Sequence, residues 1–418
     1  MGRCGFTTIR LVRGLDSSHL AQCLHRIFGS MALLISSAAL FLFLHFLSSP
    51  GVTPVDTASG KITANWSADL RSAVGGGALG LVVGRGHETR LQPTTSLWFL
   101  DNNTVAATFV TREEGVALAS RDNSDANLPL QLRGTFLDVR TGKVISTQAW
   151  PSQSRFAGIA SVYDGNFVTQ RGVLLTLYSL DAKEARRLSL PPIDPDLWGW
   201  VAHPSPTGRS ILFATPNLRT TAETPWVWVD ATTLQIVRSW KEKQSGWVGI
   251  SDDTAAMAAC SFPLSHCSPS VEVRGVTTEW KTIVPIERRF QSIPRFLDEG
   301  TIFLSGHPWQ LLQTNGKVIF TEAKPFEGSI AISSVGGKRF VVPFFQSKGG
   351  VAALDIGAHG ELKTISIYDA PFRERSYKLE VKGPKIREQA RLALSPDGSK
   401  LAILYEESVY LFQLPPAH

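Results

Sequence analysis

Cysteine is scarce in this sequence, and the residue patterns of the common catalytic sites are missing. Its 418 residues include four cysteines and nine scattered histidines. The chain has no Gly-x-Ser-x-Gly elbow, no His-Glu-x-x-His zinc helix, no phosphate-binding loop and no regular Asp-x-Asp-x-Asp calcium loop. We therefore predict no catalytic residue, no metal ligand and no cofactor.

Charge is also modest, at 19% charged residues and a formal net charge of +6. No run of basic residues is interleaved with aromatics, so nucleic-acid binding is not predicted. A hydrophobic share of 43% excludes a disordered chain and provides ample material for a core. The 11 Trp and 22 Phe, together with 35 Gly and 24 Pro, favour many strands over long helices.

The cysteines fall into two pairs along the chain. Cys4 and Cys23 precede a long apolar segment. Cys260 and Cys267 flank a turn-rich stretch short enough for a disulfide to close in an oxidising compartment. We predict a Cys260–Cys267 disulfide, with two unrelated buried thiols as the alternative. No second cysteine pair follows, which argues against a zinc site.

The apolar segment, residues 31–47, carries no formal charge and is about 17 residues long, at the lower edge of the length of a bilayer-spanning helix. The preceding residues 1–30 are basic, and Asp56 is the first charge after the segment. This asymmetry predicts a cytoplasmic N-terminus and a C-terminal domain outside the cytoplasmic membrane, in the periplasm. A proline crowds the potential cleavage site at 48–51, so we predict an uncleaved signal anchor, with a cleaved signal peptide as the alternative.

Residues 48–61 are rich in Pro, Gly, Ser and Thr, as expected of a linker. Gly75–Gly80 matches the dinucleotide-binding fingerprint by letter, but no strand precedes it and no helix is evident behind it. We interpret it as a flexible join or a glycine-rich strand edge. The β domain is predicted to span residues 62–418.

From about residue 92 onward the chain repeats a unit of paired strands. A strand leads to a tight turn and an apolar return strand; a variable loop, a third strand, a second turn and a closing strand follow. The clearest first turn is Ser395-Pro396-Asp397-Gly398, where proline presets φ and glycine permits a positive φ. First turns are expected at 101–103, 164–166, 206–208, 252–253, 298–300, 336–337 and 397–398. Second turns are expected at 138–142, 181–183, 230–233, 274–275, 314–316 and 359–360.

The repeat spacing averages roughly 50 residues, as in the four-stranded blades of propellers. A single twisted sheet cannot bury both faces, so neighbouring sheets must stack, and a closed ring removes the exposed end faces. We predict an all-β fold, a single β-propeller of seven four-stranded blades, with insertions near 111–131 and 364–386. The last unit has three strands, and its fourth is expected from residues 62–95.

Three segments resemble the WD40-like propeller repeats of exported bacterial proteins, the class that includes the TolB-type propellers. They are Ser395–Ala402, His203–Leu212 and Ile250–Asp253. The resemblance covers residues 92–415 and implies a fold, not an activity. The Gly-His and Trp-Asp marks of true WD40 repeats are absent, which argues against the eukaryotic scaffold family.

An aromatic and cationic set of residues is predicted at the rim of the central channel. Aligning the units on the first turn places two tryptophans and an arginine where the first strand begins, and three further residues lie in the same inter-blade loops. Such a rim can stack on and pair with an anionic or sugar-like ligand. The alternative is that the tryptophans pack between blades and the arginines are solvated. The predicted ligand-binding residues are Trp198, Trp200, Trp247, Arg288, Arg289 and Arg391.

Other polar residues have simpler interpretations. His203 and His307 each precede a proline and are expected in loops, and Asp252 and Asp253 are expected to form a turn. The first-strand residues are mostly small and apolar, which favours a plugged or dry channel.

We expect a non-enzymatic module, held at the membrane by residues 31–47, that binds a protein or a cell-envelope ligand at the propeller rim. A propeller hydrolase or lactonase acting in the channel mouth is the enzymatic alternative, and stoichiometric Ca²⁺ or Zn²⁺ in the pure protein would favour it. A sensor domain that signals through the helix is a third class.

Overall fold

The fold is described from a computed structural model. It describes residues 60–74, 95–112, 130–152, 154, 157–193, 199–215, 223–242, 246–261, 266–267, 270–278, 280–285, 294–305, 309–322, 331–332, 339–346, 361–369, 373–381, 386, 390–405 and 407–417. All of them belong to one compact unit, Ala58–His418. The predicted anchor lies outside these ranges, and within them no helix is both long and apolar enough to cross a bilayer.

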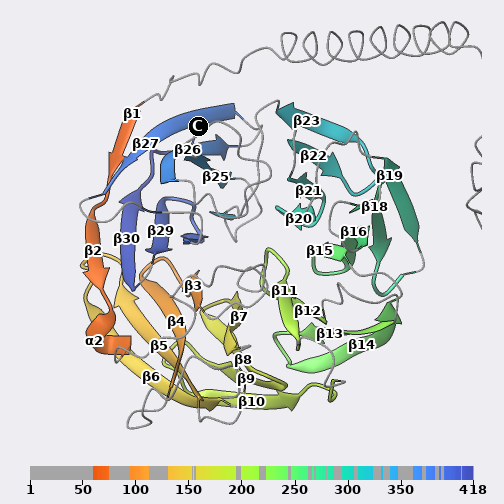
Figure 1. Ribbon diagram of the computed structural model, residues 1–418, viewed down its shortest axis with the longest axis horizontal. Coiled ribbons are helices and arrows are strands. Elements are labelled where there is room, and N and C mark those ends of the chain that lie inside the picture. Colours follow the sequence, from red (N-terminus) through yellow and green to blue (C-terminus); the bar gives the residue numbers. More distant parts are fainter. Residues whose placement is uncertain are drawn as a thin grey trace, which may run out of the picture. The chain divides into compact units, whose positions relative to one another are not determined.

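The described residues form seven sheets, which we number as blades in chain order (Figure 1). Blade 1 contains β3 (Thr95–Phe99), β4 (Thr104–Arg112), β5 (Leu130–Asp138) and β6 (Val144–Ser152). Blade 2 contains β7 (Ala157–Tyr163), β8 (Asn166–Arg171), β9 (Leu174–Tyr178) and β10 (Glu184–Ser189). Blade 3 contains β11 (Val201–Pro204), β12 (Ser210–Ala214), β13 (Thr224–Asp230) and β14 (Gln235–Glu242).

The remaining four blades follow the same antiparallel order, with an extra strand in blades 4 and 6. Blade 4 contains β15 (Gly246–Ile250), β16 (Thr254–Ser261), β18 (Ser270–Gly275) and β19 (Lys281–Pro285), and β17 (His266–Cys267) pairs with the end of β16. Blade 5 contains β20 (Pro294–Phe296), β21 (Thr301–Leu304), β22 (Trp309–Gln313) and β23 (Val318–Glu322). Blade 6 contains β24 (Ala331–Ile332), β25 (Arg339–Gln346), β26 (Glu361–Asp369) and β27 (Arg373–Glu380), with β1 (Gly60–Thr63) added in parallel to β27. Blade 7 contains β28 (Arg391–Leu394), β29 (Lys400–Tyr405), β30 (Ser408–Gln413) and, from the start of the domain, β2 (Trp66–Asp69).

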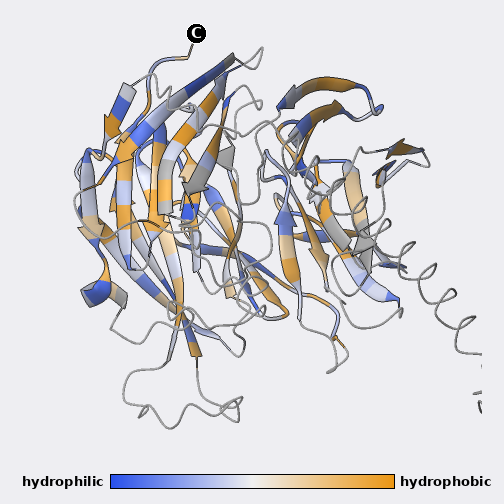
Figure 2. Cartoon of the chain, turned by 45° about the horizontal axis from the view of Figure 1, so that its top comes forward, coloured by the Kyte–Doolittle hydropathy of each residue, from blue (hydrophilic) through white to orange (hydrophobic). Residues whose placement is uncertain are grey.

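Burial follows the position of each strand in its blade. The second strands are almost fully buried; all five residues of β12, for example, are buried. The outer strands β10 and β14 are mostly exposed, and Figure 2 shows hydrophobic residues concentrated in the interior strands. The first strand of a blade lies nearest the centre of the ring and the fourth lies outermost (Figure 1). Successive residues of a strand point to opposite faces of the sheet, so the alternation of apolar and polar residues determines which side chains pack against the neighbouring blades.

The core consists of layers between successive blades. Among the described residues there is one buried hydrophobic cluster for each of the seven neighbouring pairs of blades, including the pair formed by blades 7 and 1. The 7–1 cluster joins Leu404 and Val409 to Phe99 and Val105. Because every sheet face is covered by the next blade, the ring is closed, and the predicted seven-bladed propeller is confirmed.

The strand β2 closes the ring, as predicted for a segment within 62–95. It pairs with β30 from Trp66↔Leu411 to Asp69↔Ser408. The Trp66 indole N–H also donates to the carbonyl oxygen of Val139 in blade 1 (2.8 Å). After β2 the chain forms a short helix, α2 (Arg71–Val74).

Aspartates stabilise the turns between strands. Backbone N–H groups donate to the Oδ1 atom of Asp138 (from Thr141, 2.7 Å) and to that of Asp298 (from Thr301, 2.6 Å). These side chains satisfy turn N–H groups that no ladder reaches, which explains the recurrence of aspartate at the predicted turns. Asp252 and Asp253 also lie in a turn, as expected.

Two predicted boundaries in blade 6 are wrong. Residues 359–360 do not form the second turn of the unit, because they precede β26, whereas the β26–β27 connection falls at 370–372. Most of 364–386 belongs to the regular strands β26 and β27, so the long connection in this unit is the one between β25 and β26. A Gly-containing stretch was interpreted as a hairpin turn, and β27 alternates apolar and polar residues only in its second half, at Tyr377 and Leu379.

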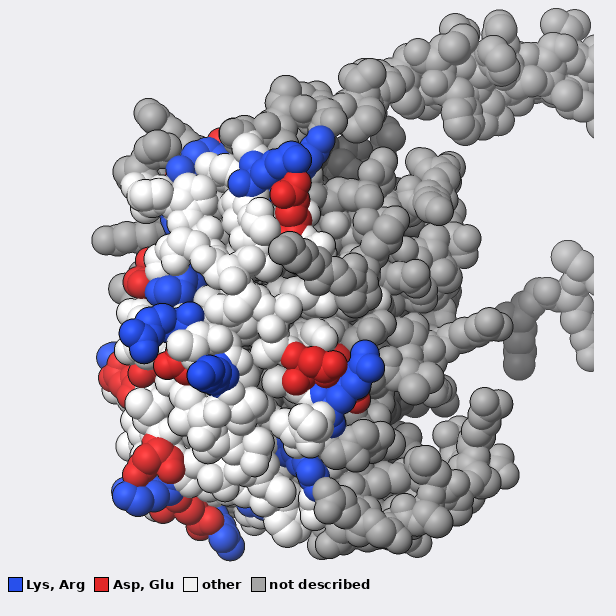
Figure 3. Space-filling view, turned by 90° about the vertical axis from the view of Figure 1, so that its left-hand side faces the viewer, with Lys and Arg blue, Asp and Glu red and all other residues white. Residues whose placement is uncertain are grey.

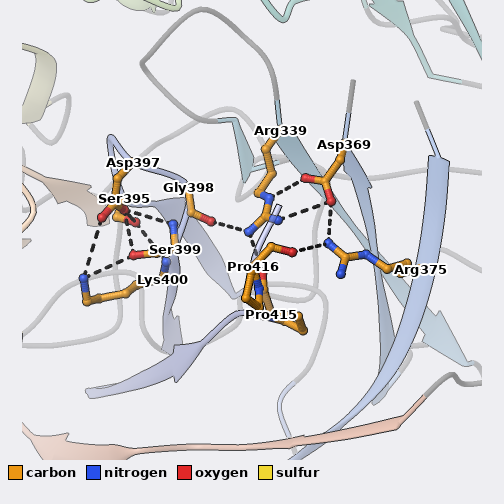
Figure 4. A network of polar contacts seen from close by, with 10 residues as sticks. All are labelled: Arg339, Asp369, Arg375, Ser395, Asp397, Gly398, Ser399, Lys400, Pro415 and Pro416. Atoms are coloured by element: carbon orange, nitrogen blue, oxygen red, sulfur yellow. Dashed lines mark hydrogen bonds and ion pairs between the residues drawn. The ribbon is translucent and has the colours of Figure 1, made fainter. Parts of the chain in front are cut away.

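An ion-pair network fastens the residues after β30 to blade 6 (Figure 4). The buried guanidinium of Arg339 donates from Nε and Nη2 to the two carboxylate oxygens of Asp369 (2.5 and 3.2 Å). Its Nη1 donates to the carbonyl oxygens of Gly398 (2.8 Å) and Pro415 (2.9 Å). Arg375 on β27 also pairs with the Asp369 carboxylate. Blades 6 and 7 are thus linked through one carboxylate that two guanidinium groups share.

Candidate functional site

The inner strands surround the central channel of the ring, and the same position recurs on six of them. The penultimate residue of each inner strand pairs with the third residue of the neighbouring strand, so these residues lie at one depth. Blade 2 differs because a bulge shifts the register of β7. The residues at this position are Trp98, His203, Gly249, Arg295, Ala331 and Ala393. Two of them, in blades 3 and 5, carry titratable side chains.

Blade 4, which separates blades 3 and 5 in the ring, contributes only a glycine at this depth. A Cβ atom on Gly249 would lie 2.6 Å from the carbonyl oxygen of Pro294, a distance that no side chain tolerates. The close approach of β15 and β20 therefore requires glycine. As a result, blade 4 places no side chain at the depth shared by His203 and Arg295.

Electrostatic interactions link these two residues to a third one, Arg391, the first residue of β28. The positive charge of Arg295 acts on His203, and the charge of Arg391 acts on Arg295. We call His203, Arg295 and Arg391 the channel cluster. Its members come from blades 3, 5 and 7, which places two cations and an imidazole around the channel.

Their surroundings disfavour positive charge. Burial, and then the charge of Arg295, lower the pKa of His203 to about 3. Burial, and then the charge of Arg391, lower the pKa of Arg295, and burial lowers the pKa of Arg391. Protein surrounds the channel cluster. Solvent still reaches it, since Arg295 is exposed and His203 and Arg391 are half-buried. This solvent access moderates the shifts but leaves their direction, so His203 is neutral at pH 7.

Within the described residues, nothing compensates the two channel arginines. The Nε atom of Arg391 is buried with no hydrogen-bond partner. No carboxylate in this part of the chain contributes to the pKa of Arg295 or Arg391. Arg339 shows the opposite situation, with Asp369 and two carbonyl groups as partners. The channel cluster is therefore suited to receive a group that brings negative charge and acceptor oxygens.

Of the six predicted ligand-binding residues, Arg391 lies on an inner strand and belongs to the cluster. Trp200 lies elsewhere: it is 1% exposed and packs in the hydrophobic core between blades 2 and 3. Its indole N–H donates to the carbonyl oxygen of Pro191 (3.1 Å). The ladders show that Val201, and not Trp200, is equivalent to Arg391. A slip of one residue reverses the face on which a side chain lies.

The other predicted residues add less to the site. The backbone of Trp247 lies in β15 opposite Ala258, at the position equivalent to Arg391, and its side chain is outside the described part. Trp198, Arg288 and Arg289 also lie outside it, as does His307. The ligand-binding role of these residues stays a prediction.

His203 and Arg295 were not predicted as site residues. His203 was expected in a loop because it precedes Pro204, but β11 includes both residues, at the inner edge of the sheet where a missing N–H is tolerated. Arg295 is in β20, a strand of only three residues that follows a proline. Counting back from the predicted turn at 298–300 would have placed Arg295 level with His203. The expectation of a mostly small and apolar inner lining counted His203 among the lining residues and left out Arg295.

Cys260 and Cys267 are directly opposite each other in the β16–β17 pairing. Their side chains lie outside the described part, so the disulfide stays a prediction. Groups of three or more His, Cys, Asp or Glu side chains that could hold a metal ion are not found among the described residues.

The outer face of the propeller differs from the channel. Over β1, β2 and β27, basic and acidic side chains are interspersed (Figure 3). Lys61 pairs with Glu380 (2.7 Å), and Arg71 pairs with Glu407 (3.5 Å). Since Lys61, Glu380 and Arg71 are exposed, these pairs contribute little stability. Lys61 and Arg71 thus have acidic neighbours, in contrast to the cations of the channel cluster.

The topology defines the class of protein, a seven-bladed β-propeller. No protein-family model matches the chain, and no curated protein matches it. Three solved structures with similar folds are a crystal structure of BBS1N in complex with ARL6DN, the WD40 domain of Neurospora crassa Pan2, and BamB from Moraxella catarrhalis.

The BBS1N match has 9% identity and a TM-score of 0.47, and covers 85% of this chain and 97% of that one. The Pan2 match has 10% identity and a TM-score of 0.49, and covers 87% and 96%. The BamB match has 10% identity and a TM-score of 0.37, and covers 77% and 85%. At such values the similarities carry no argument about function, and the propeller assignment rests on the sheets themselves.

Proposed function

We propose that this chain is a non-enzymatic binding module that holds a protein or a cell-envelope ligand at its central channel. The observation that carries the proposal is the channel cluster, in which Arg295 and Arg391 have no compensating carboxylate among the described residues. Uncompensated charge is unfavourable inside a protein, so a site that retains it is suited to a charged partner.

The cellular setting belongs to the same proposal. Residues 31–47 anchor the chain in the cytoplasmic membrane, and the propeller lies in the periplasm, in the manner of the exported TolB-type propellers whose repeats it resembles. The support is the charge asymmetry around the apolar segment. In this arrangement the anchor supplies local concentration, and the propeller supplies recognition.

Site-specific photo-cross-linking in membranes tests the binding site. A photoreactive residue at Val201, on an inner strand, is expected to cross-link one defined partner. The same residue at Ile236, on the outer strand β14 and 39% exposed, is the matched control and is expected to give no such product. Equal products from both positions would refute a channel site.

Reporter fusions test the setting. A reporter that is active only after export, joined after residue 60, is expected to be active and to remain with the membrane fraction. Cytoplasmic activity, or release into the soluble fraction, would refute the anchored periplasmic topology.

A further inference from the structure

We infer that the channel cluster is an oxyanion site: His203, Arg295 and Arg391 together bind a carboxylate or phosphate group of the ligand. The inference rests on the proposed function and specifies the chemistry of the group that enters the channel.

The first argument is the convergence of charge from separate blades. Arg295 and Arg391 lie on the inner strands of blades 5 and 7, and each charge is felt by another member of the cluster. Two like charges held together by a rigid ring raise its free energy. An anion between them would relieve this repulsion and gain two charge-assisted contacts.

The second argument is the contrast between arginines within this one chain. Arg339 has a bidentate carboxylate and two carbonyl oxygens as partners. In the described structure Arg391 leaves its buried Nε atom without an acceptor, as Arg375 does, but unlike Arg375 it has no carboxylate partner. An unpaired buried donor is costly, and a planar guanidinium is the group that pairs best with two oxygens of a carboxylate or phosphate.

The third argument is the solvent access and the donor next to these cations. Arg295 is exposed, and His203 and Arg391 are half-buried, so a solute can reach the cluster. A neutral imidazole has one N–H donor, so His203 can bind an oxygen without adding a third positive charge. The cluster therefore offers two cationic forks and one neutral donor, a set that favours oxyanions over chloride.

Thermal-shift and calorimetric titrations of the full-length protein test the inference. Inorganic phosphate and citrate serve as probes, at ionic strength held constant with sodium chloride. We expect saturable binding and a rise in melting temperature with at least one of them, and the better probe distinguishes phosphate from carboxylate as the preferred group. No saturable response to either probe would overturn the inference.

Two variants, Arg295→Gln and Arg391→Gln, locate the site. Each is expected to weaken binding by about tenfold or more, since each removes a charge-assisted contact. Arg140→Gln, which changes an exposed arginine in the β5–β6 turn, is the matched control and is expected to leave affinity unchanged. Unchanged affinity in both channel variants would overturn the assignment.

The stability of the unliganded variants separates binding from a structural role. Removing one of two repelling charges is expected to keep or raise the melting temperature. A lower melting temperature, or failure to fold, would show that these arginines are structural and would contradict the inference.

The outcome is also distinguishable from that of the proposed function. If the Val201 cross-link persists in the Arg295→Gln and Arg391→Gln variants, the module binds its partner without this site. If phosphate or citrate binds and no cross-link forms, the oxyanion site stands and the partner proposal fails.

Discussion

At the residue scale, the Asp369 carboxylate is the charge on which the blade 6–7 network depends. The side chains of Arg339 and Asp369 are only 6% and 5% exposed. Asp369→Asn would remove the negative charge and leave two arginines, Arg339 and Arg375, without their counter-ion. Breaking a buried ion pair on one side costs about 3–5 kcal/mol, and we expect a loss of this order in the free energy of unfolding, measured by urea denaturation.

The matched control is Glu380→Gln, which breaks the exposed Lys61–Glu380 pair. We expect no measurable change, because solvent screens this pair. Equal losses in the two variants would mean that the network of Figure 4 contributes no more than a surface contact.

His203 predicts a specific pH dependence of stability. Burial lowers its pKa in the folded chain toward about 3, below the ordinary value of about 6.5 expected after unfolding. Below about pH 6.5 the unfolded state binds a proton that the folded state does not, so stability falls as the pH decreases toward 3. Above that range the residue contributes no pH dependence.

Between neutral pH and about pH 4, we expect the free energy of unfolding to fall less steeply in His203→Asn than in the wild type. The two slopes should differ by the uptake of one proton. Aspartates whose pKa is lowered, such as Asp138 and Asp230, also lose stability in acid, but they do so in both proteins. The difference between the two urea-unfolding curves therefore isolates the histidine. Parallel pH profiles would show that the imidazole is not held neutral by its surroundings.

At the scale of the element, hairpins were predictable and loops were not. Turns such as Asp397-Gly398 contain residues whose local conformation fixes the reversal, and they recur at regular spacing. His359-Gly360 also contains a glycine, but it precedes β26 and lies outside the described residues. Composition identifies a turn, whereas only the pairing of strands decides which turn it is.

The site was likewise predictable only in part, because the turns are recognised from composition and the strand pairing is not. Arg391 was found because β28 ends in the clearest turn of the chain. Trp200 was aligned one residue out of register and is buried between blades. Arg295 was missed because the three residues of β20 are too few to show alternation. Convergence of His203, Arg295 and Arg391 depends on the closing of the ring, which no local pattern encodes.

The β16–β17 hairpin allows a direct test of the predicted disulfide. Cys260 and Cys267 are paired across its two strands, and directly opposed residues are close enough for a disulfide. We expect intact-mass analysis of the exported protein to find these two cysteines resistant to alkylation until a reductant is added. Cys4 and Cys23, on the predicted cytoplasmic side, serve as the internal control and should react without reductant. Alkylation of all four at equal rates would contradict the prediction.

At the scale of the whole molecule, the channel exists only while the ring is closed, and β2 closes it. The contact between blades 7 and 1 contains a buried hydrophobic cluster in which Leu70 packs with Leu411. Removing residues 1–70 would delete β2 and expose both the edge of β30 and this cluster. Removing only residues 1–59 would leave β1 and β2 in place and provides the matched control.

We expect the shorter deletion to keep a single cooperative unfolding transition. We expect the longer one to lower the melting temperature and to self-associate, because an uncovered strand edge is a template for pairing. Calorimetry and light scattering on the two proteins measure these effects. If both deletions melt alike, the ring does not depend on β2 for closure. The channel cluster would then be held by contacts within each pair of blades, and the closed ring would not be needed to form the oxyanion site.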